Sequence, residues 1–326
     1  MKITGNRDFL FFNPVEKNLS YWLRHIAFWP VNWFYRAFTS LARPAHREKE
    51  FNVSVCAIYK DEAPYLREWI EFNRLVGVDH FYLYNNNSED NHREVLRPYL
   101  ESGLVTLTEW PEDHAQVKAY EDCIRRFSDR TQWIGFIDID EFIVPLEGSS
   151  IADFLPRFRN RPAVLIYWRL FNSAGLLTRD RSRLVTEDFV VASGKICNKG
   201  KCFLNTDWTY MSGSPRNSSM FHVLWTTRWG IPIPPFDEFG DIPLVYRGRR
   251  DIPVQLNHYT VKSKEEYMEK DLKGDVFFLE PSHDPASFYK KEFRCDSPDF
   301  TAFRYLSGLK ERLSRQTPED PGASDR

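Results

Sequence analysis

The sequence of 326 residues lacks an excess of charge of either sign, a long apolar run and a leading apolar segment. Its 44 Lys and Arg residues almost cancel its 46 Asp and Glu residues, so no overall positive field is present to attract nucleic acid. No stretch of about 18 uncharged apolar residues occurs, which argues against a membrane-spanning helix. Because the first residues do not have the pattern of a secretory signal, we expect a cytoplasmic protein with no nucleic-acid partner.

Paired cysteines are also missing. The chain has five cysteines, an odd number, and most of their spacings are too wide for a set of disulfides. Cys197 and Cys202 are close together, but a C-x4-C pair without a second pair is a weak zinc signal. We therefore expect reduced thiols.

Apolar and aromatic residues, in contrast, are abundant. They make up 42% and 16% of the chain, enough to bury one large core or two moderate ones. The segment Leu19–Ala42 concentrates Trp, Tyr and Phe around Arg24, His25 and Arg36, and Pro30 interrupts it. Two interpretations stay open. The segment lies on a membrane surface, where aromatic and basic side chains meet the headgroups, or it packs as a hairpin on the main domain.

From Val53 onward, apolar runs of strand length alternate with segments of helical periodicity. This alternation predicts an α/β fold with a mostly parallel central sheet flanked by helices. Pro64 is expected to begin the first helix and Gly77 to end it. The first four strands are predicted at Val53–Tyr59, His80–Tyr84, Leu104–Trp110 and Trp133–Ile137, and the third helix at Ala115–Phe127. Later strands are predicted at Val164–Trp168 and Phe189–Ala192, and a loop over the acceptor at Ile231–Pro243.

Polar clusters follow three of the predicted strands. In a parallel sheet, ligands bind outside the carboxyl ends of the strands, so these clusters are expected to meet at one edge. Loops of unrelated sequence that converge in this way suit a nucleotide. The clusters are Lys60, Asp61 and Glu62 after the first strand, Asn85 to Ser88 after the second, and Asp138 to Glu141 after the fourth. In the second cluster, Asn85 and Asn87 are the candidate binding residues.

The D-x-D pair Asp138 and Asp140 has the chemistry of a metal site. The side-chain alternation of a strand would place both carboxylates on the same side. Hard oxygen ligands with room for phosphate oxygens suit Mn²⁺ or Mg²⁺, and such a cation would neutralise a leaving diphosphate. Two solvated loop acids are the alternative interpretation. The position of the pair after the fourth strand favours the metal site.

These motifs together resemble glycosyltransferase family 92 and its bacterial relatives among the family 2-like glycosyltransferases. The resemblance covers about two thirds of the chain, from Val53 to Gly274, and the combination is far more specific than any one motif. It is carried by Val55 to Glu62, Tyr65 to Trp69, Gly77 to Ser88, Asp138 to Phe142, and a later block of Asn257, His258, Tyr259, Lys262, Ser263, Glu265, Glu266, Tyr267, Lys270 and Gly274.

The resemblance implies a GT-A type nucleotide-sugar-binding fold, a UDP-sugar donor, dependence on Mn²⁺ and transfer of galactose with inversion. It implies that Asp138 contacts the nucleotide or the metal, that Asp140 ligates the metal, and that His258 is the third protein ligand. A neutral imidazole is a suitable partner for carboxylates around Mn²⁺. Lys262 is expected at the donor diphosphate, whereas Lys270 is equally well explained as a solvated helix charge.

Inversion requires a general base to take the proton of the acceptor hydroxyl. The sequence does not single one out. The weak candidates are Asp237 and Glu238 in the Pro-rich loop, and His222.

The expected organisation is an N-terminal aromatic and basic extension (1–50), a GT-A domain (51–312) and a disordered tail (313–326). Within the domain, 51–145 is the nucleotide-binding half and 146–312 the acceptor-binding half. The expected function is synthesis of a surface polysaccharide or lipopolysaccharide from a UDP-sugar and a glycan or glycolipid acceptor, on the inner face of the membrane. The alternatives are an inactive glycosyltransferase-like scaffold or sugar-binding protein, and an aspartate-based phosphotransferase, which would carry D-x-D on its first strand.

Overall fold

The computed structural model describes most of the chain from residue 46 to residue 315. Outside the described ranges lie most of Leu19–Ala42, nearly all of Ile231–Pro243 and the tail beyond residue 315. The described residues are 19, 23, 26 and 30, which are helical, and 46–112, 116–159, 163–194, 197, 200–208, 225–226, 232–233, 253–273 and 285–315.

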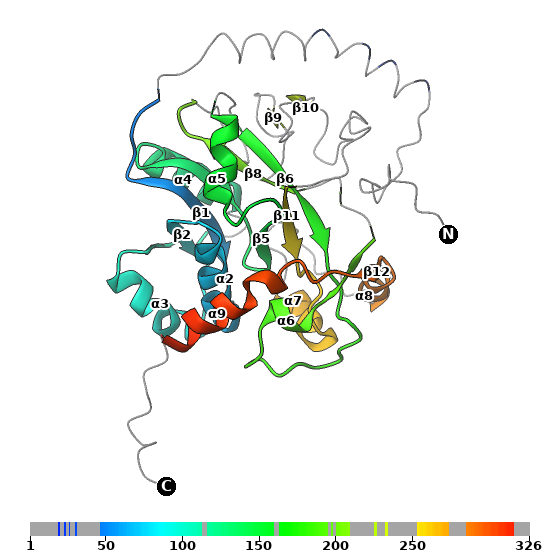
Figure 1. The fold of residues 1–326 in the computed structure, drawn as a ribbon. Coiled ribbons are helices and arrows are strands. Elements are labelled where there is room, and N and C mark those ends of the chain that lie inside the picture. Colours follow the sequence, from blue (N-terminus) through cyan, green and yellow to red (C-terminus); the bar gives the residue numbers. More distant parts are fainter. Residues whose placement is uncertain are drawn as a thin grey trace.

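The first half of the fold alternates strands and helices, as the sequence predicts. Strands pair in the order β4-β1-β2-β3, and all three pairings are parallel (Figure 1). The predicted α/β architecture is confirmed, with strand ends shifted by no more than two residues. The elements are β1 (Phe51–Tyr59), α2 (Ala63–Leu75), β2 (His80–Asn85), α3 (His92–Glu101), β3 (Val105–Glu109), α4 (Gln116–Phe127) and β4 (Thr131–Phe136).

The second half extends the sheet with strands of mixed direction. β8 lies antiparallel between β4 and β6, and β11 joins β6 in parallel and β5 in antiparallel pairing. The strand predicted over Phe189–Ala192 is observed as the shorter β7, which begins at Val191, after α6 has ended at Asp188. The strands are β5 (Glu141–Pro145), β6 (Ala163–Leu170), β7 (Val191–Ser193), β8 (Gly200–Asn205), β9 (Trp225–Thr226), β10 (Pro232–Ile233), β11 (Val254–His258) and β12 (Cys295–Pro298).

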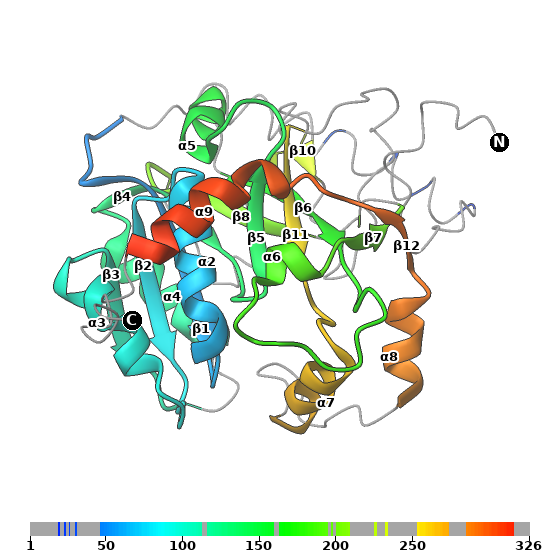
Figure 2. The same cartoon turned by 60° about the horizontal axis from the view of Figure 1, so that its bottom comes forward.

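Helices cover both faces of the sheet. The larger apolar cluster packs α2, α3 and α9 against one face, and a second cluster packs α4 against the other. α9 lies across α2, so the end of the described chain covers its beginning (Figures 1 and 2). The later helices are α5 (Ile151–Phe154), η1 (Leu155–Phe158), α6 (Val185–Asp188), α7 (Lys264–Lys273), α8 (Pro285–Glu292) and α9 (Phe303–Arg315).

The connection after α2 shows how the sequence ends a helix. Gly77 has φ +100°, a conformation that L side chains rarely adopt, and a Cβ there would meet the Ser150 hydroxyl oxygen at 2.2 Å. Glycine at this position therefore allows both the turn into β2 and the close packing of α5 against it.

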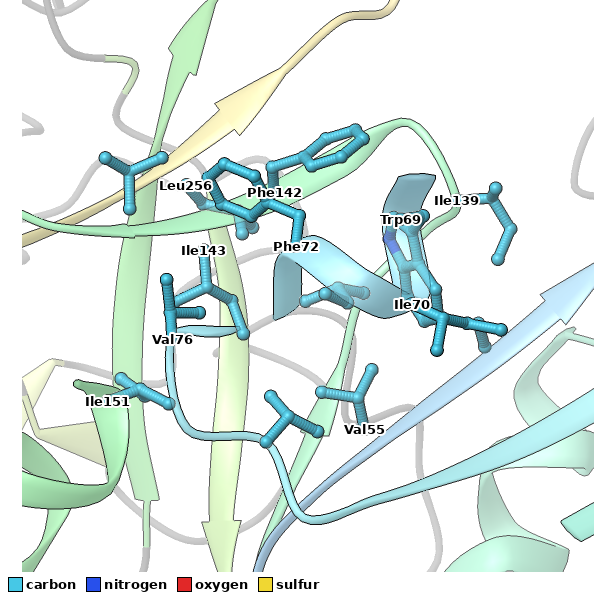
Figure 3. Close-up of a cluster of buried hydrophobic side chains, with 14 of the residues drawn as sticks. Val55, Trp69, Ile70, Phe72, Val76, Ile139, Phe142, Ile143, Ile151 and Leu256 are labelled. Carbon is cyan, nitrogen blue, oxygen red and sulfur yellow. The ribbon is translucent and has the colours of Figure 1, made fainter. Parts of the chain in front are cut away.

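Trp69 marks the point where the core reaches the candidate site. Its ring is fully buried among side chains of the larger cluster, beside Ile70, Phe72 and Ile139 (Figure 3). The indole Nε1 donates to the backbone oxygens of Asp138 (3.0 Å) and Glu141 (2.8 Å). The turn that carries the D-x-D pair is thus fixed by a core residue.

The predicted thiol state agrees with the structure, since all five cysteines are free. Cys197 and Cys202 are buried, and the described residues contain no group of three or more His, Cys, Asp or Glu side chains arranged to hold a metal ion. Within the same residues, no helix is both long enough and apolar enough to cross a membrane.

Candidate functional site

The loops after β1 and β2 meet at the carboxyl edge of the sheet. The Asp61 backbone N–H donates to the Ser88 hydroxyl oxygen (2.9 Å), and the Glu89 N–H donates to Asp61 Oδ1 (2.7 Å). Asp61 has φ +52°. The structure therefore brings together two of the three predicted clusters, and Lys60 stands exposed beside them.

Asn85 and Asn87, both predicted to bind the donor, are bonded within the protein. The buried Asn85 donates through Nδ2 to Glu109 Oε2 (2.6 Å), and its Oδ1 accepts from the Ser88 N–H (3.0 Å). The exposed Asn87 has φ +56° and donates to the Pro111 carbonyl oxygen (3.3 Å). These contacts shape the loop, and Asn87 is the more accessible of the two amides.

The D-x-D turn joins β4 to β5. The Glu141 N–H donates to the Asp138 carbonyl oxygen (3.0 Å), and the Asp138 N–H donates to Glu141 Oε2 (2.9 Å). With the two bonds from Trp69, this turn has little freedom to move. Burial raises the pKa of Glu141 well above its ordinary value, and the Lys201 ammonium opposes that rise.

The Asp138 carboxylate is held by three donors. Lys201 Nζ lies 2.7 Å from Oδ2, while Gln116 Nε2 (3.2 Å) and the Tyr120 hydroxyl (3.3 Å) donate to Oδ1. The Asp138 side chain is still 36% exposed, whereas that of Lys201 is 1% exposed. Sequence reasoning missed Lys201. The available signal was a lysine inside an otherwise apolar strand segment, where a buried charge requires a partner.

Asp140 points to a different set of side chains. Its Oδ2 lies 2.5 Å from Lys270 Nζ, and its Oδ1 lies 3.5 Å from His258 Nε2. Oδ1 is buried and has no hydrogen-bond partner among the described residues. The Tyr259 N–H donates to the Asp140 carbonyl oxygen (2.9 Å), which fixes the backbone against β11.

His258 reaches Asp140 because of strand register. β11 pairs antiparallel with β5 so that His258 lies opposite Glu141, 117 positions earlier in the numbering. Its ring packs 4.8 Å from the Trp168 ring, centroid to centroid. His258 and Asp140, far apart in sequence, therefore face one another as the resemblance implies.

The charges around Asp140 favour its ionised form. Burial opposes ionisation, but the Lys270 ammonium and His258 hold the pKa of the Asp140 carboxyl well below its ordinary value. Burial likewise opposes the charge on Lys270, yet Asp140 holds the pKa of Lys270 above its ordinary value. An unpartnered, ionised oxygen beside an imidazole is a fitting place for a divalent cation.

Lys262 and Glu62 form a pair close to Asp140. Lys262 Nζ lies 3.9 Å from Glu62 Oε2 and 3.7 Å from the centroid of the Tyr65 ring. Burial lowers the pKa of Lys262, with Glu62 and Asp140 opposing. Lys262 also has φ +53°, and it lies just before α7, whose first residue, Lys264, donates its N–H to the Leu176 carbonyl oxygen (3.1 Å). Both residues were predicted to bind the donor.

The three predicted metal ligands do not all lie together. Asp140 and His258 are side by side, whereas Asp138 turns its carboxylate to Lys201. The participation of Asp138 in a metal site stays a prediction. The general-base candidates His222, Asp237 and Glu238 lie outside the described residues.

Comparison with known proteins gives a family match over this part of the chain. Residues 49–207 match the model of glycosyltransferase family 92. A glycosyltransferase family 92 protein of Oryza sativa subsp. japonica is 32% identical over 120 residues, which are 36% of this chain and 20% of that protein. The chain spans only about a fifth of the length of the first plant relatives it matches.

Two further relatives are named for an activity. The Caenorhabditis elegans protein β-1,4-galactosyltransferase galt-1 is 30% identical over 113 residues, covering 30% of this chain and 27% of that protein. Galactan β-1,4-galactosyltransferase GALS2 of Arabidopsis thaliana is 30% identical over 122 residues, covering 33% and 24%. Among solved structures, S. aureus TarS 1-349 in complex with UDP is only loosely alike, with 13% identity and a TM-score of 0.31 over 39% of this chain and 38% of that one.

Proposed function

Because the chain belongs to glycosyltransferase family 92 through residues 49–207, we propose that it transfers a sugar from a UDP-sugar donor to a glycan or glycolipid acceptor. The observation that carries the proposal is the pairing of Asp140 and His258 at the carboxyl edge of the sheet. The buried Asp140 Oδ1, which has no hydrogen-bond partner among the described residues, lies 3.5 Å from His258 Nε2. Ligands bind at this edge in open α/β sheets.

The proposed metal ligands are Asp140 Oδ1 and His258 Nε2. Mn²⁺, or Mg²⁺, would supply Lewis-acid stabilisation of the leaving diphosphate. Two protein ligands leave positions for donor oxygens and water, and Asp138 is proposed to act beside them on the donor side. Lys262 and Lys270 lie close enough to Asp140 to contribute positive charge to the diphosphate.

Galactose is the proposed sugar, transferred with inversion. The support is that two of the relatives are named as β-1,4-galactosyltransferases. Inversion needs a base on the acceptor side. His222, Asp237 and Glu238 remain the proposed candidates.

The test is isothermal titration of a UDP-sugar panel with and without Mn²⁺, using wild type, Asp140→Asn and the control Asp153→Asn, an exposed acid on α5. We expect one donor to bind the wild type and the control only when Mn²⁺ is present, and Asp140→Asn to lose at least about a hundredfold in donor affinity, as expected for the loss of a ligand. Donor binding that depends on neither Mn²⁺ nor Asp140 would refute the metal site. Donor binding without turnover on any acceptor would favour the scaffold alternative, and no donor binding would favour the phosphotransferase.

Residence on the inner face of the membrane is a separate proposal. Leu19, Leu23 and Ile26 are each in helical conformation and are 75%, 57% and 69% exposed. Exposed apolar side chains in this segment support interfacial binding, which would bring the enzyme to a glycolipid acceptor for a surface polysaccharide or lipopolysaccharide.

Sedimentation with anionic phospholipid vesicles tests the membrane proposal. We expect the wild type to sediment and a Leu19→Ser/Leu23→Ser/Ile26→Ser variant to stay largely in solution. Equal sedimentation of the two proteins, or none of the wild type, would contradict the proposal.

A further inference from the structure

Three carboxylates lie within four residues at the D-x-D turn, and their counter-charges come from distant parts of the chain. Asp140 and Glu141 are buried, and Asp138 is partly exposed. Lys201 Nζ lies 2.7 Å from Asp138 Oδ2 and 3.4 Å from Glu141 Oε2. This lysine therefore stands between two carboxylates, at a position that solvent does not reach.

Strand packing gives Lys201 a fixed place. β8 lies between β4 and β6, and Lys201 is paired with Ile166 in the register. The preceding residue is Gly200, whose backbone passes so close to β6 that a Cβ there would meet the Ile166 carbonyl oxygen at 1.9 Å. Lys201 is thus presented to the D-x-D turn from a strand with little room to shift.

The two aspartates of the motif differ in what their oxygens can still bind. Each aspartate has an ammonium at Oδ2, Lys201 at Asp138 (2.7 Å) and Lys270 at Asp140 (2.5 Å). The difference is at Oδ1, because Asp138 Oδ1 already accepts hydrogen bonds from Gln116 and Tyr120. Asp140 Oδ1 is buried and unpartnered within the described part of the chain, and His258 is its neighbour.

We propose that Lys201 is a positioning residue that acts as the counter-ion of Asp138, so that the divalent cation binds at Asp140 and His258 instead. The proposal rests on the metal-dependent function proposed above. In this arrangement Asp138 presents its exposed edge to the donor and is not a metal ligand. A buried ammonium is costly to desolvate, and the ion pair with Asp138 offsets that cost.

The test is titration of the donor-free protein with Mn²⁺, followed by the electron paramagnetic resonance signal of unbound Mn²⁺. Lys201→Gln removes a positive charge near the site, so we expect Mn²⁺ to bind roughly tenfold more tightly. If Lys201 were purely structural, Lys201→Gln would weaken Mn²⁺ binding or leave it unchanged. Lys201→Arg should restore the wild-type affinity. Lys49→Gln is the matched control, since Lys49 is a buried lysine paired with Asp207 (3.3 Å), and it should leave Mn²⁺ affinity unchanged.

A double-variant comparison separates charge from ligation. Asp138→Asn should weaken Mn²⁺ binding by no more than about tenfold through loss of charge. Asp138→Asn combined with Lys201→Gln leaves the local charge unchanged, so its Mn²⁺ affinity should return to within about threefold of wild type. If Asp138 were a ligand, the double variant would stay as weak as Asp140→Asn, and the inference would be overturned. Unchanged Mn²⁺ affinity in Lys201→Gln would also overturn it.

The failure of this inference differs from the failure of the proposed function. If the wild type binds Mn²⁺ and donor but the double variant does not recover Mn²⁺ affinity, only the role of Lys201 is refuted. A wild type that binds no Mn²⁺ removes the proposed metal site and this inference with it.

Discussion

His80 is buried at the start of β2 and shows how one residue can set the pH dependence of stability. Its Nε2 lies 2.8 Å from the Thr106 hydroxyl oxygen, and its ring stacks on Phe51 at 4.3 Å. Burial, with a contribution from the positive charge of Arg130, lowers the pKa of His80 to about 4, and Glu50 opposes this.

The expected consequence is a loss of stability in mild acid. An unfolded His takes up a proton below about pH 6.5, whereas the folded His80 stays neutral down to about pH 4. The unfolded state therefore binds more protons in this window, and the free energy of unfolding should fall by about 2 kcal/mol from pH 7 to pH 5 through His80 alone.

Urea unfolding of wild type and His80→Gln at several pH values measures how much His80 contributes to the pH dependence of the free energy of unfolding. The glutamine variant keeps a polar group near Thr106 but cannot titrate. Its stability should fall less steeply between pH 7 and pH 5. Parallel profiles for the two proteins would show that His80 is not the cause.

At the scale of single elements, β8 depends on the absence of a side chain at Gly200. A Cβ at this position would lie 1.9 Å from the Ile166 carbonyl oxygen, which is backbone and cannot rotate away. Gly200→Ala should separate β8 from β6, lower the free energy of unfolding by at least about 2 kcal/mol, and move Lys201 away from Asp138.

Gly148→Ala is the control for backbone strain alone. Gly148 has φ +73° but has nothing within 4 Å of the added Cβ, so the cost should be only about 1 kcal/mol. Thermal unfolding of both variants compares the two effects. Equal losses of stability would mean that the β8–β6 contact is not tight in solution.

α2 contacts two different parts of the molecule through two consecutive buried residues, Glu68 and Trp69. Its buried face carries Trp69 into the core, where the indole also holds the D-x-D turn. On the same helix, the buried Glu68 accepts hydrogen bonds from the N–H groups of Val185 (2.6 Å) and Thr186 (2.9 Å) at the start of α6. One helix thus connects the first half of the fold to the later part of the chain.

At the scale of the whole molecule, the family match ends at residue 207, but the candidate site does not. His258, Lys262 and Lys270 come from β11, α7 and the turn between them. α9 then returns to pack on α2, and Leu309 is fully buried there. We therefore expect the described part of the chain from β1 to α9 to unfold as one unit.

Leu309→Ala tests this unity. The lost apolar contacts and the cavity should cost about 3 kcal/mol, and intrinsic tryptophan fluorescence should report the same lowered midpoint as far-UV circular dichroism. The exposed Ser307→Ala on the same helix should change stability by less than about 0.5 kcal/mol. A separate, unshifted transition in tryptophan fluorescence would show that α9 is not part of the cooperative unit.

The order of elements in the first half was determined by the sequence, because periodicity is local information. A strand buried on both faces is a continuous apolar run, and a helix repeats its apolar face about every 3.6 residues. Val53–Tyr59 and the helix that Pro64 begins were therefore predicted close to their observed bounds. The position of Asp138 and Asp140 after the fourth strand followed from the same local pattern.

The irregular later half was predicted less well. Short strands such as β7 and β8 are stabilised by their neighbours in the sheet and carry weak patterns of their own. The pairing of His258 with Asp140 was predicted by resemblance and depends on the register of β11 against β5.

Only the tertiary structure decided how the two aspartates differ. Lys201 is 63 positions from Asp138, and Lys270 is 130 positions from Asp140. No local pattern connects residues so far apart. Sequence alone determined that two carboxylates follow the end of a buried strand, because the apolar run of that strand is local information. The predicted alternation does not apply to them, since both lie in the turn after β4 and face different lysines. Which cation each carboxylate faces depends on strand order and register, and these are set by long-range packing that the whole chain must complete.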